Sequence, residues 1–430
     1  MITVIASAAS PLQGISSGLS RVRPAIVQPS WFAVLSIGRR ERSCSRGNHV
    51  PNRPWAIPGF GPRLNCGFRL SGMVAFLRLM APRLSADELT DFARELLRHV
   101  GLEDDKARAV AEVLVEADLL GHTTHGLALL APYLEEIERG GMAKSGGPQV
   151  VADFPAVVTW DGRRLPGPWL VARALELAMA RAERNGLCAV TIRRSHHIAC
   201  LAAYLRPVAE RNLVAILTCS DPAVATVAPF GGRKGLFTPN PIAAAWPTGG
   251  DPVILDFSAS ITTNALTKRL QAAGKKFPGA WALDAEGHAT DAPAVLFTAP
   301  PGTLLPAGGI DHGHKGFALA LLVEALTSAL AGHGRADPSE GWGASVFLQV
   351  FNPACFGGVD AFRREAGHLA AACRENPPRP GVERVRLPGE TGLRRRLEQL
   401  ANGVELHPAI LPALLPWARK LGAERLPTGA

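Results

Sequence analysis

The sequence lacks most of the motifs by which enzymes of known mechanism are recognised. It contains no GxGxxG turn opening a helix and no P-loop, so neither a Rossmann-type nor a P-loop nucleotide site is predicted. Beyond residue 80 it has no GxSxG and no HExxH, which removes the usual sequence support for serine hydrolases and zinc peptidases. Five of its seven cysteines follow residue 80, without CxxC spacing, and this pattern implies neither a disulfide framework nor a structural zinc site.

Long hydrophobic runs and, near the N-terminus, acidic residues are also scarce. No stretch reaches the ~18 uncharged apolar residues of a membrane span; the nearest, 316–332, contains Glu324 and predicts a core helix. Residues 1–80 hold ten arginines and one acid, Glu41. Taking these from the totals of 46 basic and 37 acidic residues leaves 36 of each in 81–430, so the +9 net charge belongs to the first segment. The neutral body argues against a nucleic-acid partner, and no membrane partner is expected.

The Arg-rich segment 1–80 shows no sustained hydrophobic period and does not predict a packed domain. Three interpretations compete: an organellar transit peptide, a disordered basic arm, or an upstream extension outside the working protein. We favour the extension, because the first clear structural signal begins just after Met80. The expected location is the cytoplasm, or an organelle if the segment is a transit peptide.

Residues 81–430 are predicted to form one α/β catalytic body, with a helical part at about 81–145, a central α/β part at about 146–335 and a C-terminal part that returns to the helical region. The predicted helices are 85–100, 104–120, 127–138, 170–185, 200–211, 316–330, 391–401 and 408–421. The predicted strands are 156–160, 188–192, 213–217, 242–246, 252–257 and 344–349.

Histidines carry the strongest chemical signal. His122 and His125 flank two threonines between Gly121 and Gly126, where glycine lets the backbone approach a ligand closely. Capping or core histidines are the structural alternative. A second group, RRSHH at 193–197, follows a predicted strand, where α/β proteins place reactive groups, and an imidazole there suits acid/base work near neutral pH. A solvated basic turn is the alternative for its arginines.

Three further loops add polar groups. Asn240 lies in the rigid string TPNP and is suited to orienting a substrate oxygen. The string DFSAS, 256–260, ends a predicted strand with groups suited to ribose or phosphate. The string GGIDHGHKG, 308–316, opens a helix with glycines and Lys315, which favours an anion site over a simple helix cap.

Seven strings in order resemble the malate/L-lactate dehydrogenase family that is unrelated to the Rossmann dehydrogenases. The strings are GHTTHG, RRSHHIACLAAYL, APFGG, TPNPIA, ILDFSAS, GGIDHGHKGFAL and RLPGE. The family also includes ureidoglycolate dehydrogenase, diketogulonate reductase and piperideine/pyrroline-2-carboxylate reductases, and the resemblance covers about residues 85–425. It implies a non-Rossmann NAD(P)-binding α/β fold with a mixed sheet and a smaller helical region, and a homodimer with an active site between subunits.

The resemblance also assigns roles to residues. His125 exchanges a proton with the substrate, Thr124 keeps the hydroxyl of the family's serine, and His197 is a second acid/base candidate. Ser220 and Asn240 fall at substrate-contacting positions. Contacts to NAD or NADP fall on Asp256, Ser258, Ser260, His314, Lys315, Gly389 and Glu390.

Two departures affect the substrate. Leu129 stands where many members carry an arginine, a natural carboxylate clamp, and Pro239 is inserted before Asn240. Arg193 or Arg194 is the expected replacement, and Arg194 is our choice. The leading hypothesis is hydride transfer between nicotinamide and C2 of a small 2-oxo/2-hydroxy acid, with a carboxylate substrate and no metal.

Other hypotheses remain open beside it. One is a reductase of cyclic 2-imino acids in the same family. Another is a metal-dependent lyase or hydrolase that uses His122, His125 and His197. A third is a non-catalytic relative that kept the fold.

Overall fold

The computed structural model describes residues 83–338 and 340–423. The predicted extension, 1–80, lies outside the described residues. The helices are α2 (Ala86–His99), α3 (Asp104–Leu120), η1 (Leu127–Leu129), α4 (Leu130–Glu138), α5 (Gly167–Asn185), η2 (Leu201–Tyr204), α6 (Arg206–Glu210), α7 (Asn264–Ala272), η3 (Pro293–Phe297), α8 (Gly309–Glu324), the π-helical η4 (Ala325–Ala329), η5 (Pro353–Cys355), α9 (Val359–Glu375), α10 (Glu390–Asn402) and α11 (Ile410–Leu421). The strands are β1 (Gln149–Phe154), β2 (Val157–Asp161), β3 (Leu187–Ser195), β4 (Val214–Ser220), β5 (Pro241–Trp246), β6 (Val253–Ser258), β7 (Ala282–Leu283), β8 (Ala289–Thr290), β9 (Thr303–Leu304) and β10 (Ala344–Phe351).

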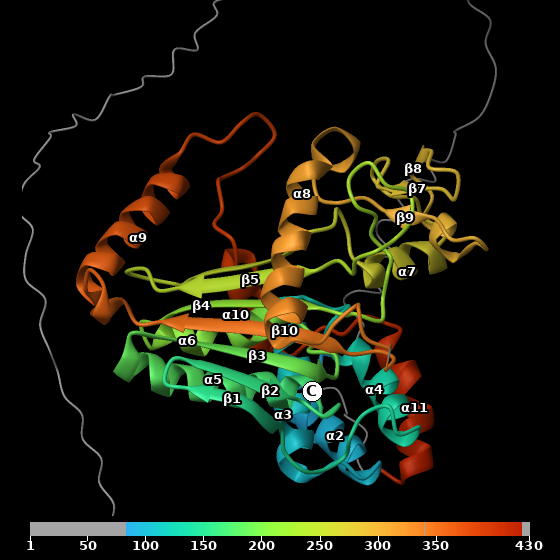
Figure 1. Ribbon diagram of the computed structural model, residues 1–430, viewed down its shortest axis with the longest axis horizontal. Helices are drawn as coiled ribbons and strands as arrows, with labels where there is room; N and C mark the ends of the chain where they lie inside the picture. The colour runs from blue at the N-terminus through green and yellow to red at the C-terminus, as the bar shows by residue number, and fades with distance from the viewer. Residues whose placement is uncertain (1–82, 339, 424–430) are drawn as a thin grey trace, which may run out of the picture. The chain divides into compact units, whose positions relative to one another are not determined.

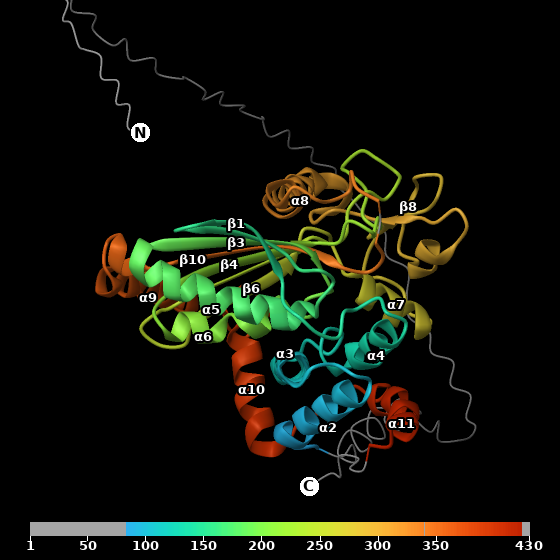
Figure 2. The same cartoon turned by 60° about the horizontal axis from the view of Figure 1, so that its bottom comes forward.

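A seven-stranded mixed sheet forms the centre of the described fold (Figure 1). Its order is β1-β2-β3-β10-β4-β5-β6, with β2 and β3 parallel and the other pairs antiparallel. Helices α5 and α6 pack on one face and α8 with η4 on the other (Figure 2). A smaller sheet, β8-β7-β9, lies beside α7 (Figure 1). The predicted α/β class with a mixed sheet is therefore confirmed.

A helical region packs against the sheet through one continuous apolar core. Helices α2, α3, α4, α10 and α11 lie together below α5 in Figure 2. Leu96 of α2, Leu114 of α3 and Val190 of β3 are each fully buried within the same cluster. Because burial of each such side chain is worth ~1.5–3 kcal/mol, the helical region and the sheet stabilise each other as one body.

The predicted helices and strands recur with shifted ends, and two helices differ more from the prediction. The predicted helix 200–211 divides into η2 and α6, because Pro207 at the start of α6 has no N–H to continue the preceding turn. The helix predicted from 316 begins at Gly309, and a non-helical φ of −125° at His312 separates its first turn from the rest.

Three elements carry too little buried surface to be visible in the sequence pattern. Strand β1 is almost entirely exposed, so it lacks the alternation of an inner and an outer face. Helix α9 buries only Ala370, and α7 buries only Thr267. In the part of the chain that the structure describes, no helix combines the length and apolar character needed to cross a bilayer.

Candidate active site

A cavity of about 350 Å³ gathers most of the chemistry predicted from the sequence. It lies among the loop that follows α3, the start of η2 and the ends of β4 and β6. Six predicted site residues line it: Thr124, His125, His197, Ser220, Asp256 and Ser258. Its size falls in the range of small-ligand sites.

His125 is positioned by the tight loop between α3 and η1. Gly121, with a φ of +89°, ends α3 in the left-handed conformation, and the His125 N–H donates to the His122 carbonyl at 2.8 Å. The Thr124 hydroxyl lies 2.9 Å from His125 Nδ1. Burial lowers the pKa of His125, while the nearby Asp256 opposes this shift. Thr124 thus holds the imidazole at Nδ1, and burial in the cavity lowers the affinity of the ring for a second proton.

His197 is held in one tautomer by its surroundings. The Ala199 N–H donates to His197 Nδ1 at 3.3 Å, and the Tyr133 hydroxyl lies 2.8 Å from the same atom. Because Nδ1 accepts, the proton of the neutral ring sits on Nε2. Burial, and then the neighbouring His125, lower the pKa of His197 to about 3. His197 is therefore a neutral hydrogen-bond donor near neutral pH, not an acid.

Two ionisable residues support the His125 loop from outside the cavity. Asp118 of α3 is 1% exposed, and its Oδ2 accepts the Leu127 N–H at 2.7 Å. A Cβ at Gly126 would lie 2.3 Å from that oxygen, so only glycine fits there. From α7, Arg269 donates to the Thr123 hydroxyl at 2.9 Å and to its carbonyl at 3.0 Å. These contacts fix the loop at both ends.

Asp118 gives a prediction for stability against pH. Burial raises its pKa to about 7, so the folded chain keeps this proton in a range where an unfolded carboxyl, with a pKa of ~3.9, has lost it. The folded state then binds more protons, and the free energy of unfolding should fall as pH rises from about 4 to about 7, by at most ~1.4 kcal/mol per unit. Asp118→Asn should remove this component. Denaturant unfolding of both proteins at several pH values checks it, and parallel pH profiles would contradict it.

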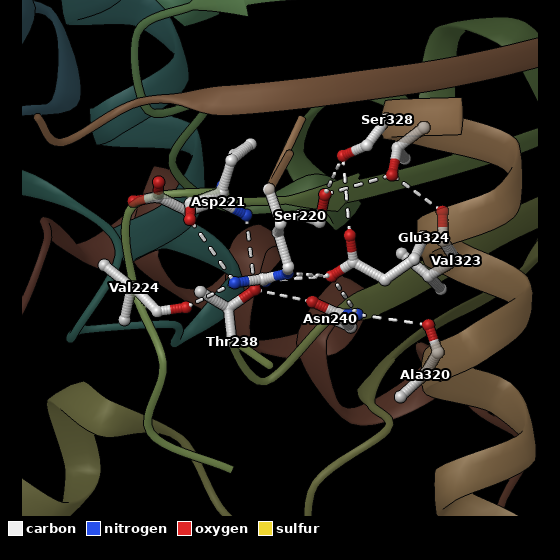
Figure 3. A network of polar contacts seen from close by, with 12 residues as sticks. Ser220, Asp221, Val224, Thr238, Asn240, Ala320, Val323, Glu324 and Ser328 are labelled. Carbon is white, nitrogen blue, oxygen red and sulfur yellow. Dashed lines mark hydrogen bonds and ion pairs between the residues drawn. The ribbon is translucent and has the colours of Figure 1, made fainter. Parts of the chain in front are cut away.

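Ser220 and Asn240 belong to a buried polar network (Figure 3). The Ser220 hydroxyl lies 3.0 Å from Thr327 Oγ1 and 3.2 Å from Ser328 Oγ, both on the π-helical turn η4. The Asn240 amide donates to the Ala320 carbonyl at 3.2 Å and to Glu324 Oε1 at 3.0 Å. Ser220 still lines the cavity, whereas Asn240 is fully buried and does not.

The expected role of Asn240 in orienting a substrate oxygen is not supported. Its Oδ1 accepts the Thr238 hydroxyl at 2.5 Å, so both ends of the amide serve the protein itself. The residue sits at a φ of +47°, a left-handed conformation that asparagine tolerates. The neighbouring Pro239, the departure noted in the sequence, lines the cavity instead.

Arg335 and Glu324 form the charged centre of this network. Arg335 donates to Glu324 Oε1 through Nε at 3.0 Å and through Nη2 at 2.8 Å, and its Nη1 donates to the Val224 carbonyl at 2.9 Å. The side chains are only 19% and 15% exposed. Since Val224 lines the cavity, the pair ties one cavity wall to α8.

Arg194, the expected carboxylate clamp, lies outside the cavity lining. Its guanidinium pairs with Asp161 at 3.3 Å and with Glu340 at 2.9 Å, and Arg193 pairs with Asp161 at 3.1 Å. Asp161 therefore pairs with both arginines and Glu340 with Arg194, so both guanidinium groups are used in ion pairs within the protein. The geometry therefore does not support a substrate role for either arginine.

Of the seven predicted cofactor contacts, three line a cavity and two are held by hydrogen bonds within the protein. Asp256 and Ser258 line the main cavity, and Gly389 lines an adjoining cavity of about 420 Å³. Buried Ser260 donates to the Thr262 carbonyl at 2.6 Å. Glu390 accepts the Leu387 N–H at 3.0 Å and also pairs with arginines.

The other two predicted cofactor contacts, His314 and Lys315, are exposed on α8 and line neither cavity. Their assignment is therefore not supported by the geometry of the single chain.

Several site residues were not predicted from the sequence. Trp342 lines the cavity, with its ring 4.9 Å from that of His197, and Tyr133 contacts His197 from α4. Asp221 directly follows β4 in the lining, and burial raises its pKa. Asp221 could have been found, since it follows a predicted strand; Trp342 and Tyr133 reach the site only through tertiary packing.

The metal hypothesis required His122, His125 and His197 to share one ion. Among residues 83–338 and 340–423, the only group able to do so is His122 with Cys200 and Asp256. The His125 and His197 rings stack with centroids 6.1 Å apart. The metal-lyase arrangement is thus not the one that the structure builds.

Comparison with known proteins agrees with this geometry. The chain is 31% identical over 335 residues to an L-lactate dehydrogenase of Cupriavidus necator, covering 76% of this chain and 95% of that protein. It is 30% identical over 344 residues to a Δ1-pyrroline-2-carboxylate reductase of Ancylobacter novellus, covering 77% and 96%. The solved malate dehydrogenase of Entamoeba histolytica shares the fold, with a TM-score of 0.75 at 23% identity over 80% and 99% of the two chains.

A match to a family model identifies the family of the chain. The model described as malate/L-lactate dehydrogenase matches residues 84–415. Members of this family are dehydrogenases and reductases that act on CH–OH or CH–NH groups, and the family implies a nicotinamide cofactor. The chain belongs to the malate/L-lactate dehydrogenase family.

Proposed function

We propose that the protein transfers hydride between a nicotinamide cofactor and C2 of a small 2-oxo/2-hydroxy acid, with His125 as the proton donor for reduction. One observation carries this proposal: His125, with Nδ1 engaged by Thr124, lines the same cavity as the neutral donor His197. In reduction of a C=O group, a proton donor supplies the proton and a neutral hydrogen-bond donor stabilises the charge that develops on oxygen.

The residues present fit a nicotinamide cofactor. The main and adjoining cavities share His122, Asp256 and Phe257, so together they offer an elongated site. Gly389 at the start of α10 lines the far cavity, where backbone N–H groups suit a phosphate, and the Asp256 carboxylate suits a ribose hydroxyl. When bound, the cofactor supplies the hydride.

The contacts of the His125 and His197 rings indicate which nitrogen of each carries a proton during reduction. For reduction the His125 ring enters protonated on both nitrogens, so that Nδ1 donates to Thr124 Oγ1 while Nε2 gives its proton to the substrate oxygen. Nδ1 keeps its proton afterwards, so the same tautomer is ready to accept a proton in the oxidation direction. His197 donates from Nε2 to a substrate oxygen without changing its charge, because Tyr133 and the Ala199 N–H hold its Nδ1 unprotonated.

The cavity wall limits the charge of the substrate. Among the described residues that line it there is no lysine or arginine, Leu129 occupies the family's arginine position, and Asp221 and Asp256 are both present. A dicarboxylate such as oxaloacetate would meet carboxylates without a lysine or arginine for its second carboxylate to pair with. A monocarboxylate is therefore favoured. The same wall also favours the second candidate, a cyclic 2-imino acid, whose protonated nitrogen balances its carboxylate.

A screen of reduced NAD and NADP against pyruvate, longer 2-oxo monocarboxylates, oxaloacetate and cyclic imino acids tests the proposal. We expect loss of reduced-nicotinamide absorbance with a monocarboxylate or an imino acid, at a kcat/KM at least about tenfold above that for oxaloacetate, a difference of ~1.4 kcal/mol. Oxaloacetate as the best substrate would contradict the charge argument. Absence of turnover with all of them would contradict the proposed activity.

Exposed apolar side chains support the proposed homodimer. On β1, Val150 and Phe154 are 53% and 64% exposed, and on α8 Leu321 and Leu322 are 49% and 51% exposed. Apolar surface of this kind commonly marks a protein interface. The mass of the protein in solution, measured by light scattering, would show two chains if it is so used and one if not.

A further inference from the structure

Three residues from separate elements bring different metal-binding groups together beside the active site. His122 lies on the loop after α3, Cys200 precedes η2, and Asp256 lies in β6. One potential ligand atom from each falls within 4.8 Å of the other two. Ligand atoms around tetrahedral zinc are roughly 3.5 Å apart, so a small side-chain movement completes the set.

Contacts within the protein hold two of the three groups and anchor the loop that carries the third. Asp256 Oδ2 accepts the Ala202 N–H at 2.9 Å and lies 3.6 Å from Cys200 Sγ. Cys200 is 3% exposed, which fixes the position of its sulfur. The backbone N–H of His122 donates to the Ala117 carbonyl at 2.8 Å, which anchors the loop below the imidazole. Preorganised ligands of this kind raise metal affinity.

The chemical types of the three ligands indicate which metal ions would bind. When an ion binds, the Cys200 thiol, which donates to Asp256 in the free protein, loses its proton to solvent. The resulting thiolate, an imidazole and a carboxylate with a fourth position open match Zn²⁺ and its analogue Co²⁺, while hard cations such as Mg²⁺ prefer oxygen alone. His122 and Asp256 line both cavities, so an ion held here sits where the two cavities meet.

We propose that His122, Cys200 and Asp256 form a zinc site that excludes the nicotinamide cofactor, so that zinc inhibits the enzyme. The inhibitory part rests on the proposed function, because it requires the cofactor to span both cavities. The metal site itself does not.

Cobalt binding tests the site without any activity. Metal-free protein titrated with Co²⁺ should develop the thiolate-to-cobalt charge-transfer absorption of one bound ion, and Zn²⁺ should remove it. Cys200→Ser should abolish the band. Cys219→Ser is the matched control, since Cys219 is a buried cysteine in the same cavity wall but outside the three-residue set, and it should keep the band. A band that is missing in the parent protein, or that survives Cys200→Ser, would overturn the proposal.

Binding of reduced NAD or NADP, followed by fluorescence, tests the inhibition. One equivalent of Zn²⁺ should weaken binding to the parent protein by about tenfold or more, and should leave the affinity of Cys200→Ser at its own zinc-free value. Unchanged affinity in the parent protein would refute exclusion of the cofactor. If neither cofactor binds in any state, the proposed function fails, and the cobalt spectrum still decides the metal site.

Discussion

His125→Asn is expected to lower kcat by about 10²–10⁴-fold, the contribution of a positioned general acid, while the affinity for reduced cofactor changes little. The reason is that His125 is the only residue of the Thr124–His125 pair able to give a proton, and His197 cannot replace it with a pKa of about 3. Asparagine keeps a polar group near Nδ1 but supplies no acid. Steady-state kinetics and cofactor fluorescence measure the two quantities separately.

Two controls accompany this variant. His288→Asn changes a histidine on the exposed β7–β8 turn, whose side chain is 80% exposed, and should leave kcat unchanged. His197→Gln keeps a neutral donor, so it should affect kcat less than His125→Asn does. Near-normal turnover by His125→Asn would contradict the assignment of the acid.

Glu324→Ala is expected to lower the free energy of unfolding by about 2–4 kcal/mol. Removing one partner of a buried ion pair leaves the other without compensation, which costs ~3–5 kcal/mol when burial is complete, and the partial exposure of this pair reduces the figure. The variant would remove the carboxylate that accepts two hydrogen bonds from Arg335 and one from the Asn240 amide. Denaturant unfolding with a constant slope measures the loss.

An exposed ion pair in the same protein provides the comparison. Arg173 and Glu176 on α5 are 60% and 63% exposed, and Glu176→Ala should cost no more than ~0.5 kcal/mol. A Glu324→Ala protein as stable as Glu176→Ala would show that the buried network contributes little. Because the pair holds the wall at Val224, a rise in substrate KM should accompany the loss of stability.

The sequence predicted those parts of the fold that bury a periodic apolar face. Helices α2 and α3 and strands β3 and β4 place their apolar residues in the core and were found within a few residues of their ends. Strand β1 and helix α9 could not be found, because they bury almost nothing. Local periodicity reports burial, and elements at the surface do not produce it.

The residues of the candidate site were likewise only partly predictable from the sequence. His125, His197, Ser220 and Asp256 were identified by resemblance, and the structure brings them to one cavity. The partners that determine what each can do lie far along the chain, as Asn240 shows: its amide is taken by Glu324, 84 residues later. Such contacts decide whether a polar side chain faces the ligand or the protein, and no local pattern encodes them.

Transfer of deuterium from cofactor to product would demonstrate the proposed hydride transfer to C2. Reduced cofactor carrying deuterium at both hydrogen positions of the nicotinamide C4 should be incubated with the best substrate of the screen, and the product examined by mass spectrometry and NMR. We expect one deuterium at C2 of the hydroxy or amino acid; for a hydroxy acid, the proton on oxygen comes from solvent by way of His125. An unlabelled product, or a label at any other carbon, would contradict it.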